Sequence, residues 1–145
     1  MNRLTFILLE STEDEDLGII KEGYSNPLVE RFISIDNENY WSYVTKSENV
    51  YFYKLYNEDN PVGTVHCEVY DGILYLSVVV FIQYQNRKIG SDAIKCVIEG
   101  KTGLEFKEIL VSVDEKNTAS MRLFQNAGFI KIGQKDGLVD LQYIM

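Results

Sequence analysis

The sequence has few of the residues that build metal centres and disulfide frameworks. Its 145 residues include two cysteines, Cys67 and Cys96, and a single histidine, His66. The cysteines lie far apart, form no CxxC motif and sit in apolar strand or helix patterns, so we interpret them as buried free thiols. A zinc site of the usual Cys and His type cannot form from this chain alone, and we expect no bound metal. Free thiols are typical of a reducing compartment, so we expect a cytoplasmic protein.

Long hydrophobic runs are also missing. No apolar stretch reaches the roughly 18 residues of a membrane-spanning helix. Residues 1–11 contain one basic residue and lack the long apolar stretch and small-residue cleavage site of a signal peptide. The chain has two prolines, no repeat and no low-complexity linker, and its length fits one domain of about 100–200 residues. We therefore expect a single domain over residues 1–145 with no membrane partner.

Basic residues are outnumbered by acidic ones. Fourteen Lys and Arg face 22 Asp and Glu, for a net charge of −8. No basic stripe is evident, so we expect no nucleic-acid partner. Residues 10–40 hold nine acids and two bases, a local −7, whereas residues 83–101 hold four bases and two acids, a local +2. The two regions are either solvated surfaces or a cation-attracting end beside an anion-attracting end.

The sequence pattern predicts strands and helices in alternation. The hydroxyl and acidic residues from Ser11 to Glu15 are typical of a helix start, and Asn26-Pro27 indicates a break, because the residue before proline avoids helical geometry. Asp71-Gly72 between two apolar runs indicates a type I′ hairpin. Strands are predicted over residues 4–9, 50–56, 61–70, 73–82, 106–113, 129–132 and 138–144, and helices from residue 11, through 28–44, over 89–99 and over 118–127. This order predicts a mixed α/β sheet.

Two blocks of sequence suggest chemistry. The predicted strand over residues 73–82 runs into a basic turn, Gln85-Asn86-Arg87-Lys88-Ile89-Gly90, that opens the next helix. Backbone N–H groups at such a helix start bind phosphate, and the two basic side chains would add charge-assisted contacts. One glycine is a weak signal by itself, since an ordinary strand–turn–helix corner has the same pattern. The second block, further along the chain, contains Asn117, Ser120, Gly128 and Phe129.

Together, these blocks resemble the GNAT superfamily of acetyl-CoA-dependent N-acetyltransferases. Residues 85–90 resemble its pyrophosphate loop, commonly written Gln/Arg-x-x-Gly-x-Gly/Ala, and the second block resembles its Asn-x-x-Ser/Ala and Gly-Phe block. The resemblance covers about residues 60–132. In the rest of the chain, Asn26-Pro27, Trp41 and Pro61-Val62-Gly63 resemble the branch that acetylates the N-termini of ribosomal proteins and related small amines.

The resemblance implies a GNAT fold, a mixed and mostly antiparallel central sheet that is flanked by helices and splayed at the cofactor site near Val80. It also implies acetyl-CoA as the co-substrate. The matching cofactor-binding positions are Val80, Phe81 and Ile82 for the pantetheine arm, Arg87, Lys88, Ile89, Gly90 and Ser91 for the pyrophosphate, and Asn117 and Phe124 beyond them. Asn117 is equally placed to be a helix N-cap, and the two roles are compatible.

Two departures from the family pattern bear on this chemistry. Lys88 stands at the first glycine of the loop, the position that usually allows the closest approach of backbone to phosphate, so weaker binding is expected. Phe124 stands where many members carry a tyrosine that protonates the departing thiolate. Since phenylalanine has no proton to give, the resemblance makes Ser120 the expected acid, one helical turn earlier on the same face.

The sequence does not fix the general base. Some relatives place a glutamate five residues before the asparagine, but here that residue is Ser112. His66 and Glu68 alternate on one face of a predicted strand, so either is a candidate, directly or through water. A single histidine in a strand is more often structural.

The resemblance further implies a primary amine as acceptor, either a small amine or a peptide N-terminus. Because the first two helices wall the acceptor side in this family and are acidic here, we expect a cationic acceptor. Tyr24, Phe32, Tyr40 and Trp41 are candidate lining residues, with core packing expected for at least two of them. One alternative is a catalytically weak or inactive module that binds CoA as a sensor or scaffold. Another, a partner-binding domain without a CoA site, is disfavoured by the two blocks. The sequence leaves a homodimer open.

Overall fold

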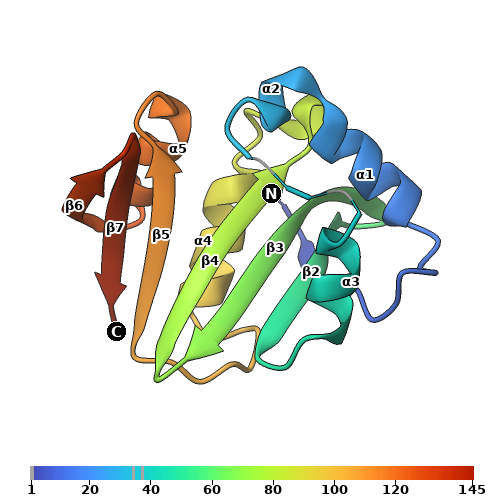
Figure 1. Cartoon of the computed structure of the whole chain (residues 1–145), viewed down its shortest axis with the longest axis horizontal. Helices are drawn as coiled ribbons and strands as arrows, with labels where there is room; N and C mark the ends of the chain where they lie inside the picture. Colours follow the sequence, from blue (N-terminus) through green and yellow to red (C-terminus); the bar gives the residue numbers. More distant parts are fainter. Residues whose placement is uncertain (1, 34, 37) are drawn as a thin grey trace.

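A seven-stranded sheet forms the centre of the part of the chain that the structure describes, residues 2–33, 35–36 and 38–145 (Figure 1). In this computed structural model the spatial order of the strands is β1-β2-β3-β4-β5-β7-β6, and only β4 and β5 pair in parallel. The strands are β1 (Leu4–Leu8), β2 (Val50–Asn57), β3 (Asn60–Tyr70), β4 (Ile73–Val80), β5 (Glu108–Asp114), β6 (Ile130–Lys135) and β7 (Leu138–Ile144). The mixed, mostly antiparallel sheet expected of a GNAT fold is confirmed.

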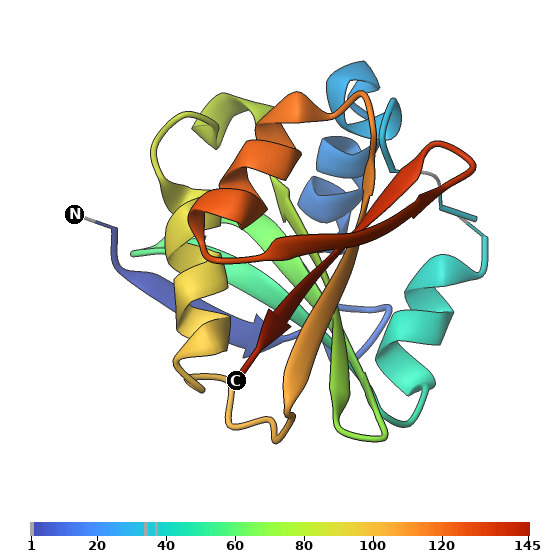
Figure 2. The ribbon, with the colours of Figure 1, turned by 90° about the vertical axis from the view of Figure 1, so that its left-hand side faces the viewer.

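Helices flank both faces of the sheet (Figure 2). The helices are α1 (Leu17–Ser25), α2 (Pro27–Glu30) and α3 (Tyr40–Lys46) on one side, α4 (Ile89–Ile98) and α5 (Thr118–Asn126) on the other, and a 3-10 turn, η1 (Ile82–Tyr84), between β4 and α4. Along β3, Val65 and Cys67 are fully buried in the core beneath α4. Because strand side chains alternate, His66 and Glu68 face the other side, toward α3. Among the described residues, none of the helices combines the length and the hydrophobicity of a membrane span.

The hairpin between β3 and β4 has the expected turn. Asp71 and Gly72 have φ values of 51° and 79°, and type I′ turns need positive φ at both central residues. The turn fixes the register of the two strands, so that His66 lies opposite Ser77. This register determines which side chains meet on the open face of the sheet.

The first helix starts later than the sequence predicts. The expected start at Ser11 is wrong, because α1 begins at Leu17 and the preceding residues form turns. Asp14 and Asp16 instead reach the Lys54 ammonium at 2.9 and 3.0 Å. Lys54 is only 8% exposed, and a buried ammonium needs opposing charge. A hydrogen bond from the Tyr56 hydroxyl and the charge of Lys54 lower the pKa of Asp16. These two acids therefore neutralise a buried lysine instead of starting a helix.

The sheet splays between β4 and β5, whose ribbons diverge in Figure 1. Their pairing ends where Tyr75 meets Leu110. Beyond that point β4 remains paired with β3 as far as Val80, and β5 remains paired with β7 as far as Asp114. The expected splay is therefore present, but it begins after Tyr75 and not near Val80.

Candidate active site

A cavity of about 440 Å³, which we call the cofactor groove, lies beside the start of α4 where β4 and β5 have separated. Its walls come from the α2 segment, the end of β4, the turn into α4 and the first turns of α5. Of the residues expected to bind the cofactor, those that line it are Val80, Ile82, Lys88, Ile89, Gly90, Ser91 and Asn117, together with the expected acid Ser120. The structure therefore brings the two sequence blocks together around one cavity.

The turn into α4 presents backbone N–H groups to the groove. Lys88 has φ 64° and ψ 13°, a left-handed conformation that explains why the family pattern places glycine here. The N–H groups of Ile89, Gly90 and Ser91 lie in the first turn of α4, where they have no acceptor within the helix and share its positive dipole end. Arg31, which sequence reasoning did not single out, adds a second basic side chain to the lining. The groove thus fits an anionic group such as a diphosphate.

Asn117 and Ser120 meet at the start of α5. The Asn117 Oδ1 accepts a hydrogen bond from the Ser120 backbone N–H at 3.1 Å, so Asn117 is the N-cap of this helix. Both residues also line the cofactor groove. The cap uses only the carbonyl oxygen of the Asn117 side chain and leaves the amide nitrogen for a ligand, so contact with a cofactor stays compatible with capping.

Three residues expected at the cofactor lie outside the groove lining. Phe81 is 1% exposed and packs beside Gly23 of α1, and its backbone N–H donates to the Val62 carbonyl. Phe124 is also buried and packs edge-on against Phe129. Arg87 stacks over the Tyr84 ring, 5.8 Å from its centroid. The first two point into apolar cores because such large rings are more stable out of water.

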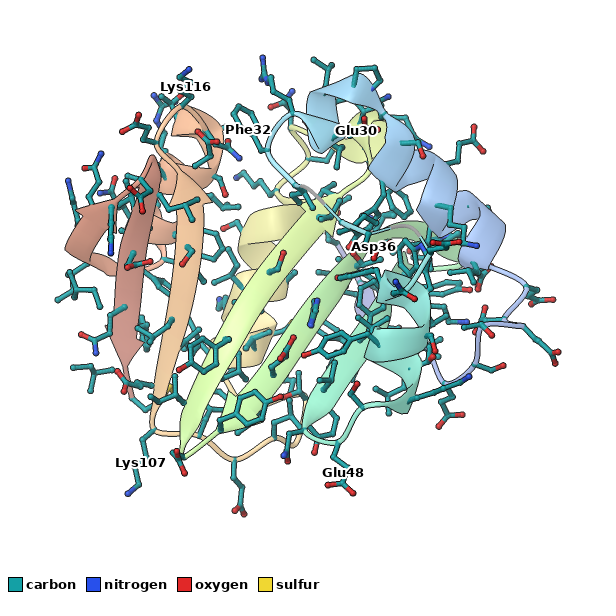
Figure 3. All side chains as sticks on the ribbon, viewed as in Figure 1. Glu30, Phe32, Asp36, Glu48, Lys107 and Lys116 are labelled. Atoms are coloured by element: carbon teal, nitrogen blue, oxygen red, sulfur yellow. The ribbon has the colours of Figure 1, made fainter. Side chains whose placement is uncertain are left out.

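A second cavity, also about 440 Å³, opens on the face of the sheet away from α4, and we call it the sheet-face cavity. In Figure 3 this face of β3, β4 and β5 is turned toward the viewer, with α3 on one side and β7 on the other. The lining residues are His66, Glu68, Tyr75, Leu76, Ser77, Leu110, Ser112, Ile132 and Asp140. Both candidate bases therefore face one cavity, while Ser120 faces the other.

A chain of hydrogen bonds runs from α3 through His66 to Glu68. The Tyr40 hydroxyl lies 2.7 Å from His66 Nδ1, and His66 Nε2 lies 2.7 Å from Glu68 Oε2. Burial lowers the pKa of His66 against the opposing effect of Glu68, so at pH 7 the ring is neutral and carries one proton. Because an ionised carboxylate only accepts hydrogen bonds, that proton lies on Nε2, and Tyr40 donates to Nδ1.

Glu68 retains acceptor capacity that His66 lacks. Besides the imidazole, the Tyr43 and Tyr70 hydroxyls donate to Glu68 Oε1 at 2.8 and 3.3 Å. A carboxylate offers about four lone-pair positions, so three donors leave one for a ligand in the cavity. Both ring nitrogens of His66 are already engaged. Of the two candidates, Glu68 is therefore the one with acceptor capacity left for a ligand, and His66 donates a hydrogen bond to it.

Asp140 is a functional candidate that sequence reasoning missed. It lies on β7 directly opposite Ser112 of β5, and the Ser112 hydroxyl donates to Asp140 Oδ1 at 2.7 Å. Its signal in the sequence is a polar residue between Val139 and Leu141, which are buried. That alternation predicts a side chain on the opposite face, but only the pairing of β5 with β7 shows that it meets Ser112.

Among the described residues, none of the acidic region over residues 10–40 lines the sheet-face cavity. Five residues of this region line the cofactor groove instead: Leu28, Val29, Arg31, Phe32 and Ile33. Tyr24 and Trp41 are buried in the core under α1 and α3, which fits the core packing expected for at least two of the aromatic residues. Tyr40 acts through His66 and does not line the cavity itself.

The two cavities are adjacent along β4. Tyr75, Leu76 and Ser77 line the sheet-face cavity, and the next three residues, Val78 to Val80, line the cofactor groove. Since β5 is unpaired with β4 beyond Tyr75, no strand closes the space between them. The two cavities therefore adjoin each other along β4 at Ser77 and Val78. Among the described residues, no group of three or more His, Cys, Asp or Glu is placed to bind a metal ion.

Comparison with known proteins agrees with this architecture. Residues 17–129 match the sequence profile of the acetyltransferase (GNAT) family. No curated protein matches the chain. Among solved structures, a domain from Methanocaldococcus jannaschii has a TM-score of 0.83 at 18% identity, covering all of both chains. Spermidine N-acetyltransferase from Vibrio cholerae, solved with CoA and spermine, has a TM-score of 0.80 at 15% identity, covering 97% of this chain and 95% of that one. The Campylobacter jejuni N-acetyltransferase PseH, solved with acetyl coenzyme A, has a TM-score of 0.79 at 8% identity, covering 98% and 99%. At such identities these structures show a shared fold.

Proposed function

The chain belongs to the GNAT family of acetyltransferases, and from this premise we propose that it transfers the acetyl group of acetyl-CoA to a primary amine held in the sheet-face cavity. The observation that carries the proposal is the adjacency of the two cavities along β4, with an anion-binding turn in one and carboxylates in the other. The whole chain, residues 1–145, acts as one domain in this proposal. The acceptor is a small amine or a peptide N-terminus, as in the branch that acetylates ribosomal proteins.

The chain's residues divide into two binding sets. When bound, acetyl-CoA supplies an acyl group activated as a thioester. The first turn of α4, with Ile89, Gly90 and Ser91, holds the diphosphate, and Lys88 adds a positive charge. Val80, Ile82 and Asn117 line the same groove. There, Val80 and Ile82 would flank the pantetheine arm, and the amide nitrogen of Asn117 would donate to the cofactor.

Glu68 and Ser120 handle the protons. An amine binds as an ammonium and must lose a proton before it can attack a carbonyl carbon, and Glu68 takes that proton directly or through water. His66 holds the carboxylate in place, and Tyr40 fixes the tautomer of His66. Ser120 lines the cofactor groove, and there it supplies a proton to the departing thiolate. A thiol with a pKa of about 8.5 is already a fair leaving group, so this acid contributes less than Glu68.

Changing Ser120 to alanine is expected to lower kcat by about tenfold and to leave the affinity for CoA unchanged, because the hydroxyl acts on the leaving group and not on binding. Thiol release and CoA titration measure the two quantities. Thr118→Ala removes an exposed hydroxyl from the same helix outside the groove lining and is the matched control. Full activity of Ser120→Ala would remove Ser120 from the mechanism and assign the proton to solvent.

The specificity constant for cationic acceptors is expected to fall as salt rises, since the net charge is −8 and two carboxylates line the sheet-face cavity. Between about 0.01 M and 0.15 M ionic strength the screening length falls from about 30 Å to about 8 Å. Measuring kcat/KM for a cationic and a neutral acceptor across this range distinguishes electrostatic attraction of the acceptor from a general effect of salt on the enzyme. Equal salt dependence for the two acceptors would show that the negative charge does not guide the substrate.

A further inference from the structure

The sheet-face cavity contains two carboxylates without a compensating cation. Glu68 enters from β3 and Asp140 from β7, and none of the residues that line the cavity is lysine or arginine. The lining histidine, His66, is neutral at pH 7, because burial lowers its pKa. Within the part of the chain that the structure describes, Asp140 accepts one hydrogen bond, from Ser112, and makes no ion pair. Two negative charges that face one cavity attract a positively charged ligand.

The two carboxylates are too far apart to bind one ammonium. In the sheet order, β4 and β5 stand between β3 and β7, and three steps of about 4.8 Å separate the outer backbones by about 14 Å along the sheet. The splay between β4 and β5 widens this further. Tyr43 on α3 holds Glu68 toward its own side of the cavity, while Ser112 holds Asp140 over β5. Because a charge-assisted hydrogen bond spans about 2.8 Å, each carboxylate needs its own positive group.

The residues between the carboxylates are largely apolar. Tyr75 on β4 and Leu110 on β5 line the middle of the cavity. This order of negative, apolar and negative surface complements a molecule with positive ends and a hydrocarbon middle. It does not complement an acceptor with a single charge, which would leave one carboxylate without a partner.

We propose that Asp140, held by Ser112, binds a second positive charge of the acceptor while Glu68 receives the reacting nitrogen. This inference rests on the proposed function and narrows its substrate class to diamines and amines with a second cationic group. The roles differ because Glu68 is connected to His66 and Tyr40. Among the described residues, Asp140 accepts a side-chain hydrogen bond from Ser112 alone, at Oδ1, which keeps Oδ2 for a ligand. Asp140 is therefore a specificity residue and takes no part in proton transfer.

Calorimetric titration of the CoA-saturated protein tests this assignment without requiring turnover. The probes are α,ω-diaminoalkanes of increasing length and the n-alkylamines of equal length. The wild-type protein is expected to bind a diamine of matching length at least about tenfold more tightly than the monoamine, and Asp140→Asn is expected to abolish the difference. Asp136→Asn removes the same charge from the turn of the same hairpin, outside the cavity lining, and should retain the preference.

Kinetics with the same amines gives a second, separate readout. Asp140→Asn should raise KM for the diamine by about tenfold and should raise KM for the monoamine by much less. Equal diamine affinity in wild type and Asp140→Asn would overturn the role of Asp140 while leaving amine acetylation intact. Tight, Asp140-dependent diamine binding without any acetylation would instead retain this inference and contradict the proposed function.

Discussion

Replacing Gly90 by aspartate is expected to weaken the binding of acetyl-CoA by about a hundredfold or more. A Cβ at this position would lie 3.1 Å from the Leu123 side chain and 3.7 Å from that of Val80, so the added carboxylate enters the groove or displaces its wall. Its negative charge would then stand among the N–H groups proposed to hold the diphosphate, and losing charge-assisted hydrogen bonds costs about 1.5–3 kcal/mol each. Titration calorimetry with CoA measures the loss.

The matched control for this variant is Gly18→Asp. Gly18 is an exposed residue of α1, and a Cβ there would meet no atom within 4 Å, so the substitution adds the same charge without touching the groove. Both variants should retain the circular dichroism spectrum of the wild type. Unchanged affinity for CoA in a folded Gly90→Asp protein would show that the turn into α4 does not bind the cofactor.

Glu68→Gln is expected to lower kcat/KM for an amine by about a hundredfold at pH 7, the usual contribution of a general base. Glutamine keeps the size of the side chain and can still accept the hydrogen bond from His66 Nε2, but it cannot take a proton. The affinity for CoA should not change, because Glu68 lies in the sheet-face cavity and not in the cofactor groove. Glu105→Gln, in an exposed loop, is the matched control.

The pH dependence distinguishes a missing base from a damaged site. An alkylamine with a pKa of about 10 is increasingly deprotonated in solution as the pH rises. If Glu68 is the base, the deficit of Glu68→Gln should be large at pH 7 and shrink steadily toward pH 10. A deficit that stays constant with pH would assign Glu68 a structural role. In the wild type, protonation of His66 should disturb the hydrogen bonds that join Tyr40, His66 and Glu68. It should do so only below the ordinary histidine pKa of about 6.5, since burial lowers the pKa of this ring.

The local features that sequence could predict are those set by neighbouring residues. The Asp71-Gly72 turn, the break before Pro27 and the N-cap role of Asn117 all depend on contacts within a few positions, and each is present. The turn into α4 could be predicted from the sequence for the same reason. Its left-handed Lys88 is a local conformation at a position where the family pattern has glycine.

Features that depend on pairing between segments far apart in the sequence could not be predicted from local patterns. The acids after Ser11 look like a helix start, but Lys54 on β2 recruits Asp14 and Asp16. The acidic side chain opposite Ser112 comes from β7, and no pattern within either strand specifies that register. The sequence offered Glu68 and His66 as alternative bases and could not choose between them. The structure adds three tyrosines from other positions of the chain: Tyr40 bonds to His66 Nδ1, and Tyr43 and Tyr70 donate to Glu68 Oε1.

The proposed function requires that a thioester in the cofactor groove and an amine in the sheet-face cavity meet where β4 and β5 separate. The most direct test is to incubate the wild-type protein with acetyl-CoA and a panel of amines and peptides, and to follow thiol release together with the mass of each acceptor. We expect thiol release that depends on the amine, with one acetyl group gained by a cationic acceptor for each CoA formed. Tight binding of acetyl-CoA with no amine-dependent thiol release would contradict the claim and show a module that binds CoA without transferring its acetyl group.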